Sequence, residues 1–582
     1  DTRGDWAQIR GVSPVQYLDG LKSLFGNYNN VRVNPYSLGQ IEILKGPSSV
    51  LYGQGSTGGI INLVSKRPKA ETEGQFWAQL GNYSRKQVAG DITGALNDDA
   101  SLTGRLVGLY RDSDTQTDYV PDNSLVLNPS LSWHASEDTK ITLIGNIQRN
   151  ESGSSTQFFP WKGTILPNEF GQIDSSTFVS EPGFDKYDTE QNALTAIVEH
   201  DNRRFERYAY IYDNDSQSWT SDFQLHGSLS TGPVSHALVF GVDFQDAKTD
   251  SDVVSGHGGY IDLYDPEYGL VTDLPTSAEL PNDPSLTNHQ LGLYVQDNMR
   301  VYDKWLISAA LRRDRATNNP EDGTVTEQYA TTGRLGFMYL MDGGISPYIS
   351  YSESFSTLIG RDAYDNPYVP LEGKQWEAGV KYQPEGTEHL LTASVYKITE
   401  ENRTTSVNAE QATDPDIVDP NGQVQTGEVE IEGVELEAQL AWDSLDVYAS
   451  YAYTDAVVSE SNTVGEEGAT LSATPDQQAS VWATYRPENW NGFKIGAGVR
   501  YVGNTSDGSA YVEQNGVVLN DPLETPSYTV FDAMIGYDWD NYSVSLDVDN
   551  LTDKTVLTSC LARGDCFYGQ QRTIMANFRY NF

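Results

Sequence analysis

The chain has 582 residues, 38% of them hydrophobic, and no run of 18 or more apolar residues. This excludes a bundle of membrane helices, each of which needs about 20 apolar residues in succession, but not a β-barrel, whose strands need apolar residues only at alternate positions. The net charge of −44 argues against nucleic acid as a partner and is more typical of a solubilising surface than of a cation site.

The first distinctive segment is a glycine-rich stretch from Ile41 to Pro68. It contains Gly53-x-Gly55-x-x-Gly58, which has the spacing of a dinucleotide-binding fingerprint. In that fingerprint the glycines open a helix, whereas here the β-prone run Gly59-Ile-Ile-Asn-Leu-Val64 follows them. We therefore reject nucleotide binding. The glycines instead favour a compact globule with tight turns in a space where bulk would clash.

From Gly74 onward the sequence alternates between apolar and polar residues in stretches of about ten, which predicts β-strands with one apolar face. The clearest of the predicted strands are Gly74–Asn82, Lys86–Ala95, Ser101–Arg111, Leu125–Ala135, Lys140–Arg149, Gln191–His200, Tyr348–Ser354, Gln375–Tyr382, Leu390–Thr399, Val429–Ala441 and Val447–Asp455.

The connections between these strands alternate in length. Short turns are expected at Asn97–Ala100, Ala135–Asp138, Met341–Gly344, Pro384–Thr387 and Trp539–Tyr542, and long loops at Glu151–Tyr187, Thr249–Asn288 and Glu400–Gly427. Short turns at one end and long loops at the other are typical of a transmembrane barrel with periplasmic turns and extracellular loops. The fold expected is therefore all-β, an antiparallel transmembrane barrel of about 22 strands.

The number of strands depends on Arg203–Gly227, which is either one long strand or a hairpin that turns at Asp213–Ser216. Single-chain bacterial barrels have an even number of strands. An odd count would therefore indicate that residues are missing near Asn202.

Cys560 and Cys566 are the two cysteines of the chain, and they lie in a short segment bounded by strands. This spacing predicts a disulfide-closed loop formed in an oxidising compartment, and the alternative is two free thiols. So short a closure stabilises by only about 2 kcal/mol, so the bridge would shape a loop tip.

The segment Thr573–Phe582 predicts the last strand. Its apolar face carries Ile574, Ala576, Phe578, Tyr580 and Phe582, and its polar face carries Met575, Asn577, Arg579 and Asn581. An apolar and aromatic face of this kind suits contact with lipid.

The glycine-rich stretch resembles the plug domain of TonB-dependent receptors, in which Lys-Gly-Pro, Leu-Tyr-Gly and Gly-Gly-x-Ile-Asn recur. Here these motifs are Lys45-Gly-Pro47, Leu51-Tyr-Gly53 and Gly58-Gly-Ile-Ile-Asn62. The resemblance implies a plug inside the barrel, and we place the plug at residues 1–72 and the barrel at residues 73–582. The TonB box, which contacts the energising partner, would precede Asp1.

Nearly the whole chain is similar to the ferric hydroxamate (ferrichrome-type) receptors of that family. The similar segments are Thr2-Arg-Gly4, Ile9-Arg-Gly11, Tyr17-Leu-Asp-Gly-Leu-Lys22, Asn34-Pro-Tyr36, Ile349-Ser-Tyr-Ser-Glu-Ser-Phe355, Lys374-Gln-Trp-Glu-Ala-Gly-Val-Lys-Tyr382, Asp549-Asn-Leu-Thr-Asp-Lys554 and Ser559-Cys560 with Cys566-Phe-Tyr-Gly569. The similarity implies a monomeric outer-membrane receptor, surrounded by lipid and lipopolysaccharide, that imports a ferric siderophore with energy from TonB. The iron would arrive already chelated, so neither a metal site nor an intrinsic cofactor is expected.

The same similarity implies a ligand site built from the plug apex and the extracellular loops. Its expected residues are Arg3, Tyr28, Phe159, Trp161, Tyr260 and Leu561. The arginine would donate to anionic oxygens around the iron, and the tyrosine would pack on the siderophore backbone. Arg10 is expected to have a structural role, paired with a buried carboxylate.

Three departures from the family pattern leave the ligand open. Asn27 and Leu561 stand where the best-known member has aromatic residues, and the loop between Gly11 and Tyr17 is shorter. A catecholate siderophore, cobalamin or a glycan is an alternative ligand, and a passive porin or a barrel enzyme is an alternative class. The seven histidines are scattered and no metal-binding or catalytic spacing occurs, so we predict that the protein is not an enzyme.

Overall fold

The computed structural model describes residues 4, 6–23, 32–136, 139–153, 158–182, 187–200, 203–212, 216–249, 263–264, 286–320, 325–463, 465–509, 512–514, 517–519 and 522–582. Within these ranges no helix has the length and the apolar character that a membrane crossing requires.

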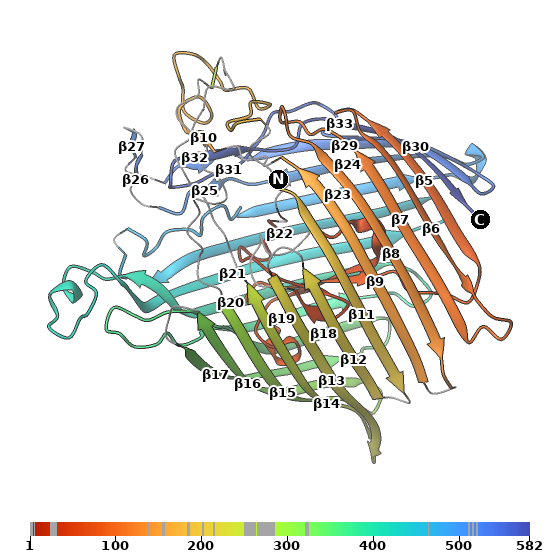
Figure 1. Ribbon diagram of the computed structural model, residues 1–582, viewed down its shortest axis with the longest axis horizontal. Coiled ribbons are helices and arrows are strands. Elements are labelled where there is room, and N and C mark those ends of the chain that lie inside the picture. Colours follow the sequence, from red (N-terminus) through yellow and green to blue (C-terminus); the bar gives the residue numbers. More distant parts are fainter. Residues whose placement is uncertain are drawn as a thin grey trace.

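The dominant element is a closed antiparallel barrel of 22 strands (Figure 1). In chain order its strands are β5 (Glu73–Gly81), β6 (Lys86–Ala95), β7 (Leu102–Asp112), β8 (Asp122–His134), β9 (Thr139–Ser152), β11 (Thr189–His200), β12 (Arg203–Tyr212), β13 (Ser216–Thr231), β14 (Val234–Thr249), β15 (Leu286–Val301) and β16 (Trp305–Pro320). The remaining strands are β17 (Thr326–Tyr339), β18 (Ile345–Ser356), β19 (Leu371–Tyr382), β20 (Leu390–Ser406), β21 (Gln423–Ala441), β22 (Leu445–Glu460), β23 (Gln477–Tyr485), β24 (Phe493–Val502), β29 (Tyr528–Trp539), β30 (Tyr542–Asp549) and β33 (Thr573–Asn581). Each strand pairs with its sequence neighbours, and β33 pairs with β5 to close the ring.

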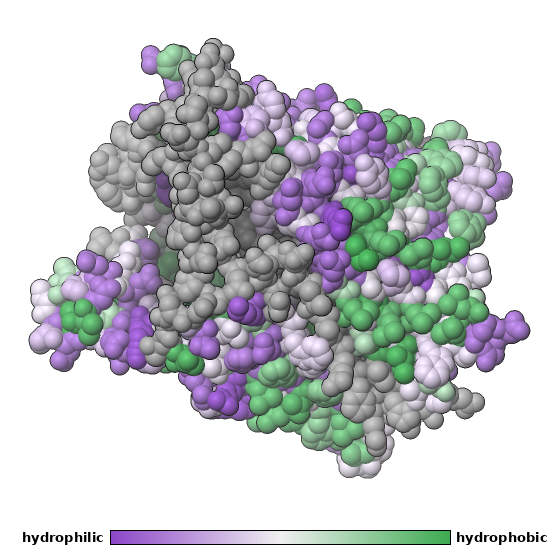
Figure 2. Space-filling model, in the orientation of Figure 1, coloured by the Kyte–Doolittle hydropathy of each residue, from purple (hydrophilic) through white to green (hydrophobic). Residues whose placement is uncertain are grey.

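The alternation in the sequence sets the two faces of the barrel wall. In β33 Ile574, Ala576 and Phe578 are exposed on the outer face, whereas Asn577 is buried on the lumen side. Figure 2 shows apolar residues gathered over the strands and hydrophilic residues at the end that carries the long loops. The predicted fold class and the predicted orientation of the last strand are therefore confirmed.

The uncertain segment after His200 forms the hairpin of β12 and β13, whose pairing runs from Arg203↔Leu225 to Ile211↔Gln217. The second of the two sequence interpretations is thus the correct one. With β11 paired to β12, the even number of strands is reached without a further strand near residue 202.

A small domain of different construction lies inside the barrel (red in Figure 1). Its four-stranded sheet has the order β2 (Leu21–Lys22), β1 (Val15–Leu18), β4 (Gly59–Ser65) and β3 (Leu38–Lys45). The 3₁₀ helix η1 (Pro35–Ser37) approaches β7, and the helix α1 (Ser49–Tyr52) approaches β16, β17 and β18. We call this domain the plug.

The glycines of the plug permit its close approach to the barrel wall. Gly53 has φ +74°, and a Cβ atom there would lie 2.5 Å from the Gln290 amide and 2.7 Å from an Arg312 Nη atom. Arg312 is fully buried and donates to Asp314 at 2.6 and 2.8 Å. Gly53, the first glycine of the spacing that mimics a nucleotide fingerprint, therefore makes room for a buried ion pair on the wall.

Arg10 joins the plug to another part of the wall, at β19 and β21. Its guanidinium donates to Glu435 at 3.0 and 2.9 Å and to Glu377 at 3.0 Å, and it lies 3.7 Å from the centre of the Tyr396 ring. Lys45 adds an ion pair with Glu435 at 3.3 Å. The structural role predicted for Arg10 is confirmed, because its side chain is buried against carboxylates of the wall.

Candidate ligand-binding site at the loop end of the barrel

Three loops from distant parts of the chain meet around one disulfide at the loop end of the barrel. The strand β10 (Phe159–Pro160) pairs with β32 (Asp565–Tyr568), which pairs with β31 (Leu557–Cys560). The bridge joins Cys560 to Cys566, whose Cα atoms are 4.0 Å apart, and the predicted disulfide is confirmed. The two cysteines thus lie on paired strands of a small sheet, whose third strand, β10, belongs to the loop between β9 and β11.

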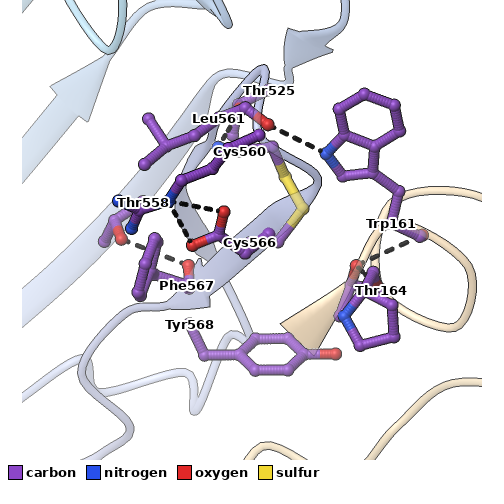
Figure 3. Close-up of a disulfide and its surroundings, with 12 residues drawn as sticks. Trp161, Thr164, Thr525, Thr558, Cys560, Leu561, Cys566, Phe567 and Tyr568 are labelled. Atoms are coloured by element: carbon purple, nitrogen blue, oxygen red, sulfur yellow. Dashed lines mark hydrogen bonds and ion pairs between the residues drawn. A yellow bond between two sulfur atoms is a disulfide. The ribbon is translucent and has the colours of Figure 1, made fainter. Parts of the chain in front are cut away.

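Trp161 packs directly on this bridge (Figure 3). Its indole Nε1 donates to the Leu561 carbonyl at 3.2 Å, and its side chain belongs to an apolar cluster with both cysteines and Leu523. The Cys560 amide donates to the Thr525 hydroxyl at 2.9 Å, which connects the loop after β24 to the same point. The disulfide is therefore the common support of three loops.

A second apolar cluster lies beside the first. Phe159 packs with Ile173 and Tyr568, and the Phe159 and Tyr568 rings are 5.6 Å apart. The Tyr568 hydroxyl donates to the Ile173 carbonyl at 3.0 Å and accepts from the Gln172 amide at 3.2 Å. Burial raises the pKa of the Tyr568 phenol, so this hydroxyl remains a hydrogen-bond donor at neutral pH.

The structure brings three of the expected site residues together. Phe159, Trp161 and Leu561 lie around the disulfide, and Phe159 and Trp161 are 0% and 2% exposed. Their side chains fill the space between loops, so their contact with a ligand stays a prediction. The expected residues Arg3, Tyr28 and Tyr260 lie outside the described part of the chain.

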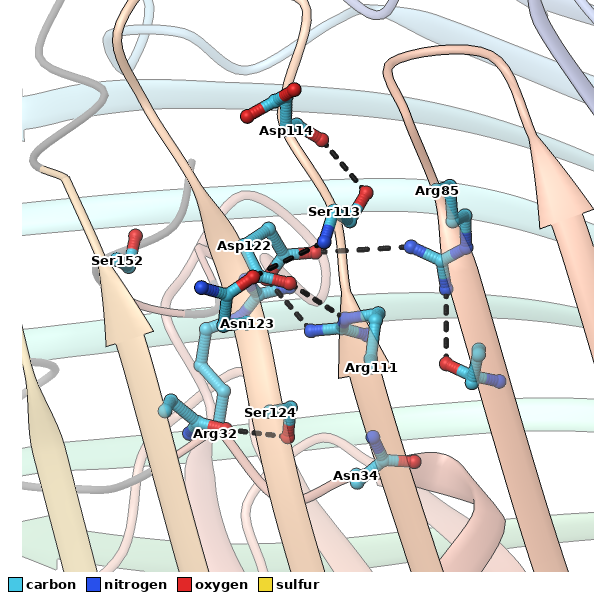
Figure 4. A network of polar contacts seen from close by, with 12 residues as sticks. Arg32, Asn34, Arg85, Arg111, Ser113, Asp114, Asp122, Asn123, Ser124 and Ser152 are labelled. Atoms are coloured by element: carbon cyan, nitrogen blue, oxygen red, sulfur yellow. Dashed lines mark hydrogen bonds and ion pairs between the residues drawn. The ribbon is translucent and has the colours of Figure 1, made fainter.

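Below these loops, a polar network on the lumen wall was not anticipated from the sequence. Arg111 at the end of β7 pairs with Asp122 at the start of β8, with 2.7 Å between Nη2 and Oδ1 (Figure 4). The alternation in β7 could have indicated that the Arg111 side chain faces the lumen, because Leu106 and Tyr110, at alternate positions of the other face, are exposed on the outside. The partner, however, depends on pairing between strands and not on spacing along the chain.

Two family models match the sequence. The model described as "TonB dependent receptor-like, beta-barrel" covers residues 39–551, and the model described as "TonB-dependent Receptor Plug Domain" covers residues 1–60. The chain belongs to the TonB-dependent receptor family. The two ranges overlap between residues 39 and 60, so the division of the receptor after residue 72 stays a prediction.

Relatives of known function resemble the receptor along its whole length. The ferrioxamine B receptor of Salmonella typhimurium is 32% identical over 100% of this chain and 86% of its own length. The ferrioxamine receptor of Yersinia enterocolitica is 31% identical over 100% of this chain and 86% of its own. The ferrichrome outer membrane transporter/phage receptor of Escherichia coli is 30% identical over 98% and 82% of the two chains.

Solved structures agree in fold. The siderophore receptor PiuA of Acinetobacter baumannii superposes with a TM-score of 0.83 at 20% identity and covers 100% of this chain and 91% of its own. The ferric-catecholate import receptor Fiu of E. coli gives a TM-score of 0.84 at 19% identity, with the same coverage. The protein is thus an outer-membrane receptor with a plugged barrel and not an enzyme.

Proposed function

We propose that the receptor binds a ferric siderophore of the hydroxamate type from outside the cell and carries it into the periplasm with energy transmitted by TonB. The observation that carries this proposal is the similarity, over nearly the full chain, to receptors named for ferrioxamine and ferrichrome. The plug is tied to the lumen wall at β21 and at β14, so passage requires that some of these contacts break.

In this proposal the ligand rests on the plug apex beneath the disulfide-supported loops. Arg3 donates to anionic oxygens around the iron, and Tyr28 packs on the siderophore backbone. Phe159, Trp161 and Leu561 hold the loops that cover the ligand. Tyr260, from the segment Thr249–Asn288 that the sequence predicts as a long loop, completes the expected set.

The other partners follow from the same proposal. TonB, with its inner-membrane energising complex, supplies the energy for transport. The iron is cargo within the siderophore, so the protein needs neither a resident metal nor an intrinsic cofactor. The outer face of the barrel contacts lipid and lipopolysaccharide, and the receptor acts as a monomer.

Titration of tryptophan fluorescence with a panel of ferric siderophores tests the ligand class. We expect ferric hydroxamates to quench the tryptophan fluorescence at much lower concentration than ferric catecholates, iron-free siderophores or cobalamin. Binding of a catecholate together with failure of every hydroxamate would contradict the proposal.

Measurement of ion conductance in a planar bilayer distinguishes the receptor from a passive porin. Because the plug is tied to the wall on two sides, we expect no steady ion conductance without energy input. Open channels in the unmodified protein would support the porin instead.

A further inference from the structure

The plug does not fit the barrel equally tightly on all sides. On one side an apolar cluster joins it to β9, β11 and β14, and the buried members of this cluster are Leu18, Leu21, Leu38, Ile144, Ile197 and Ala247. On another side lies β3, the edge strand of the plug sheet, which is paired with β4. The Ile41 and Ile43 side chains of β3 are exposed. The plug therefore leaves space along β3.

That space is a cavity of about 760 Å³ between β3 and the wall strands β15 to β21, which follow one another in the ring (Figure 1). We call it the β3 cavity. Amide and hydroxyl groups line it, among them those of Asn298, Ser308, Ser350 and Thr392. Small-molecule sites in proteins have volumes of about 300–1,000 Å³. The β3 cavity is thus large enough for such a solute and can bind it through hydrogen bonds.

Toward the loop end, contacts between the plug and the wall close the β3 cavity. Arg10 donates to Gln375 at 2.9 Å and to the Glu435 carboxylate at 3.0 and 2.9 Å. Two residues nearer the loops than Gln375, Gly373 leaves no room for a Cβ atom beside the Thr57 side chain. A solute that comes from the loop end can therefore enter here only after these contacts break.

Toward the tight turns, the β3 cavity is open. Asn298 and Arg300, near the end of β15, and Lys381, near the end of β19, line this end and are exposed. Tight turns follow both strands, and in outer-membrane barrels such turns lie on the periplasmic side. The cavity therefore leads from the Arg10 contacts toward the periplasm.

Two cations in the wall of the β3 cavity, Arg334 and Lys381, have no carboxylate partner in the part of the chain that the structure describes. Arg334 is paired in register with Ala310 of β16 and Ser352 of β18, whose small side chains leave space around the guanidinium. The Lys381 ammonium lies 5.9 Å from the centre of the Tyr348 ring. Both cations are therefore available to a solute in the cavity.

The other cations of the β3 cavity are paired. Arg10 and Lys45 both contact the Glu435 carboxylate, at 2.9 and 3.3 Å. Arg300 Nε lies 3.4 Å from the carboxylate of Asp303 in the adjoining turn. These ion pairs hold the plug or the turn in place, so they do not need a solute as a partner.

The two unpaired cations mark two levels of the β3 cavity. Arg334 is in register with Ser352, which is in register with Gln375, so Arg334 lies at the level of the Arg10 contacts. Lys381 lies six residues further along β19, which corresponds to about 20 Å at about 3.3 Å per residue. One cation is therefore at the closed end of the cavity and the other at the open end.

We infer that the ferric hydroxamate passes the plug through the β3 cavity, where Arg334 and then Lys381 bind the negatively charged oxygens around the iron. Guanidinium and ammonium groups donate charge-assisted hydrogen bonds to such oxygens. The inference rests on the proposed function and deepens it, because it names a second contact region for the same ligand. If the cavity were only a gap beside a loosely fitting plug, transport would depend on neither cation.

The first test removes both charges in the full receptor, by Arg334→Gln together with Lys381→Gln. We expect the import of a radiolabelled ferric trihydroxamate to slow at least about tenfold, which corresponds to about 1.4 kcal/mol. Binding to cells without energy input, measured separately, reports on the outer site and should keep its affinity. Arg334→Lys together with Lys381→Arg preserves the charges and should preserve import. Lys304→Gln is the matched control, because Lys304 pairs with Asp342 at a tight turn.

The second test places a thiol in the wall of the β3 cavity. Both cysteines of the chain are joined in the disulfide, so an introduced cysteine is the only free thiol. We expect import of the ferric trihydroxamate to slow the modification of Ser350→Cys by a thiol reagent, and the glutamine pair should abolish this protection. Ser543→Cys is the matched control, because Ser543 alternates with the outward-facing Tyr542 on β30, which does not line the cavity.

Each failure has a separate meaning. Equal modification of Ser350→Cys with and without import would overturn the route. Unchanged import in the glutamine pair would overturn the role of the two cations. Weaker surface binding in that pair, or an equal loss of import in the charge-preserving pair, would overturn it as well, since either result indicates a structural role. Failure of the unmodified receptor to bind any ferric trihydroxamate would instead contradict the proposed function.

Discussion

Trp161 is a single side chain that holds loops from distant parts of the chain together. The indole is buried against the disulfide and holds the Leu561 carbonyl. A buried Trp→Ala change typically costs about 3–5 kcal/mol. Here the loss would fall on the loops and not on the barrel, whose strands make none of these contacts.

We therefore expect Trp161→Ala to weaken the affinity for the ferric siderophore and to leave the melting temperature of the barrel unchanged. Fluorescence titration and calorimetry measure the two quantities. Trp490→Ala, at the turn end of the barrel in η4 (Glu488–Trp490), is the matched control. Unchanged affinity in Trp161→Ala would show that the loop between β9 and β11 does not contribute to the site.

Lys22 is the buried cation on the β2 side of the plug. It donates to Gln54 at 3.0 Å, and burial lowers the pKa of its ammonium from 10.5 to about 7 despite the nearby Asp314 and Asp243. Between about pH 7 and pH 10.5 the Lys22 ammonium is protonated in the unfolded plug but not in the docked plug, so the unfolded plug binds more protons. The free energy of unfolding of the plug therefore rises with pH, by at most about 1.4 kcal/mol per pH unit for one proton.

Lys22→Met removes this titration and should flatten the rise between pH 7 and pH 10. Urea unfolding of the plug, followed by a fluorophore at the exposed position Gln40, measures the slope. Lys69→Met is a suitable control, because Lys69 is 55% exposed and pairs only locally with Glu73. An identical slope in Lys22→Met and the unmodified protein would show that Lys22 does not titrate there.

At the scale of elements, the disulfide loop is a support for its neighbours. Replacing both Cys560 and Cys566 with Ser removes a short closure worth about 2 kcal/mol. We expect the barrel to fold normally while the Trp161 emission shifts to longer wavelength, because its apolar partners loosen. Emission spectra and heat-dependent electrophoretic mobility test this. A variant that fails to form the barrel would show that the bridge stabilises the whole protein.

Elements could be predicted where a local pattern determines them. Alternation predicted the strands, and β6 was predicted with its observed bounds, Lys86–Ala95. The strands β20 and β21 extend further than Leu390–Thr399 and Val429–Ala441, to Ser406 and from Gln423. Beyond the membrane both faces meet water, so alternation fades while backbone pairing continues.

The site could be predicted less well, because its contacts join distant residues. Trp161 meets Leu561 across 400 positions, and Arg10 meets Glu435 across 425. Ion pairs in the lumen are also hard to recognise from the sequence, because polar residues that face the lumen are expected on every strand. Arg312 and Arg111 therefore look like ordinary lumen residues until the strand pairing is known.

At the scale of the whole molecule, transport requires that the plug move or rearrange against the wall. Thr57 of the plug lies beside Gly373 of β19, where an added Cβ would be 3.2 Å from the Thr57 Cβ. This is a few tenths of an ångström below the usual Cβ–Cβ range of about 3.5–4.5 Å in disulfides. A bridge between Thr57→Cys and Gly373→Cys is therefore feasible with a small local shift.

We expect the oxidised double variant to bind the ferric siderophore with unchanged affinity and to import none of it, and reduction should restore import. Uptake of radiolabelled iron and surface binding measure the two steps. The unmodified receptor treated with the same reductant controls for opening of the Cys560–Cys566 bridge. Normal import by the oxidised variant would show that this part of the plug stays in place during transport.

The pairing of β33 with β5 also constrains how the barrel is made. These two strands are separated by about 500 residues, and the seam includes paired bonds between Gly74 and Phe582 at 2.8 and 2.9 Å. Because β33 follows every other barrel strand in the chain, the ring cannot close until all of them have left the ribosome. Until then both edge strands present unpaired backbone groups, which invite aggregation. Biogenesis must therefore shield an open sheet, and substitutions at the seam should slow assembly more than they weaken the finished barrel.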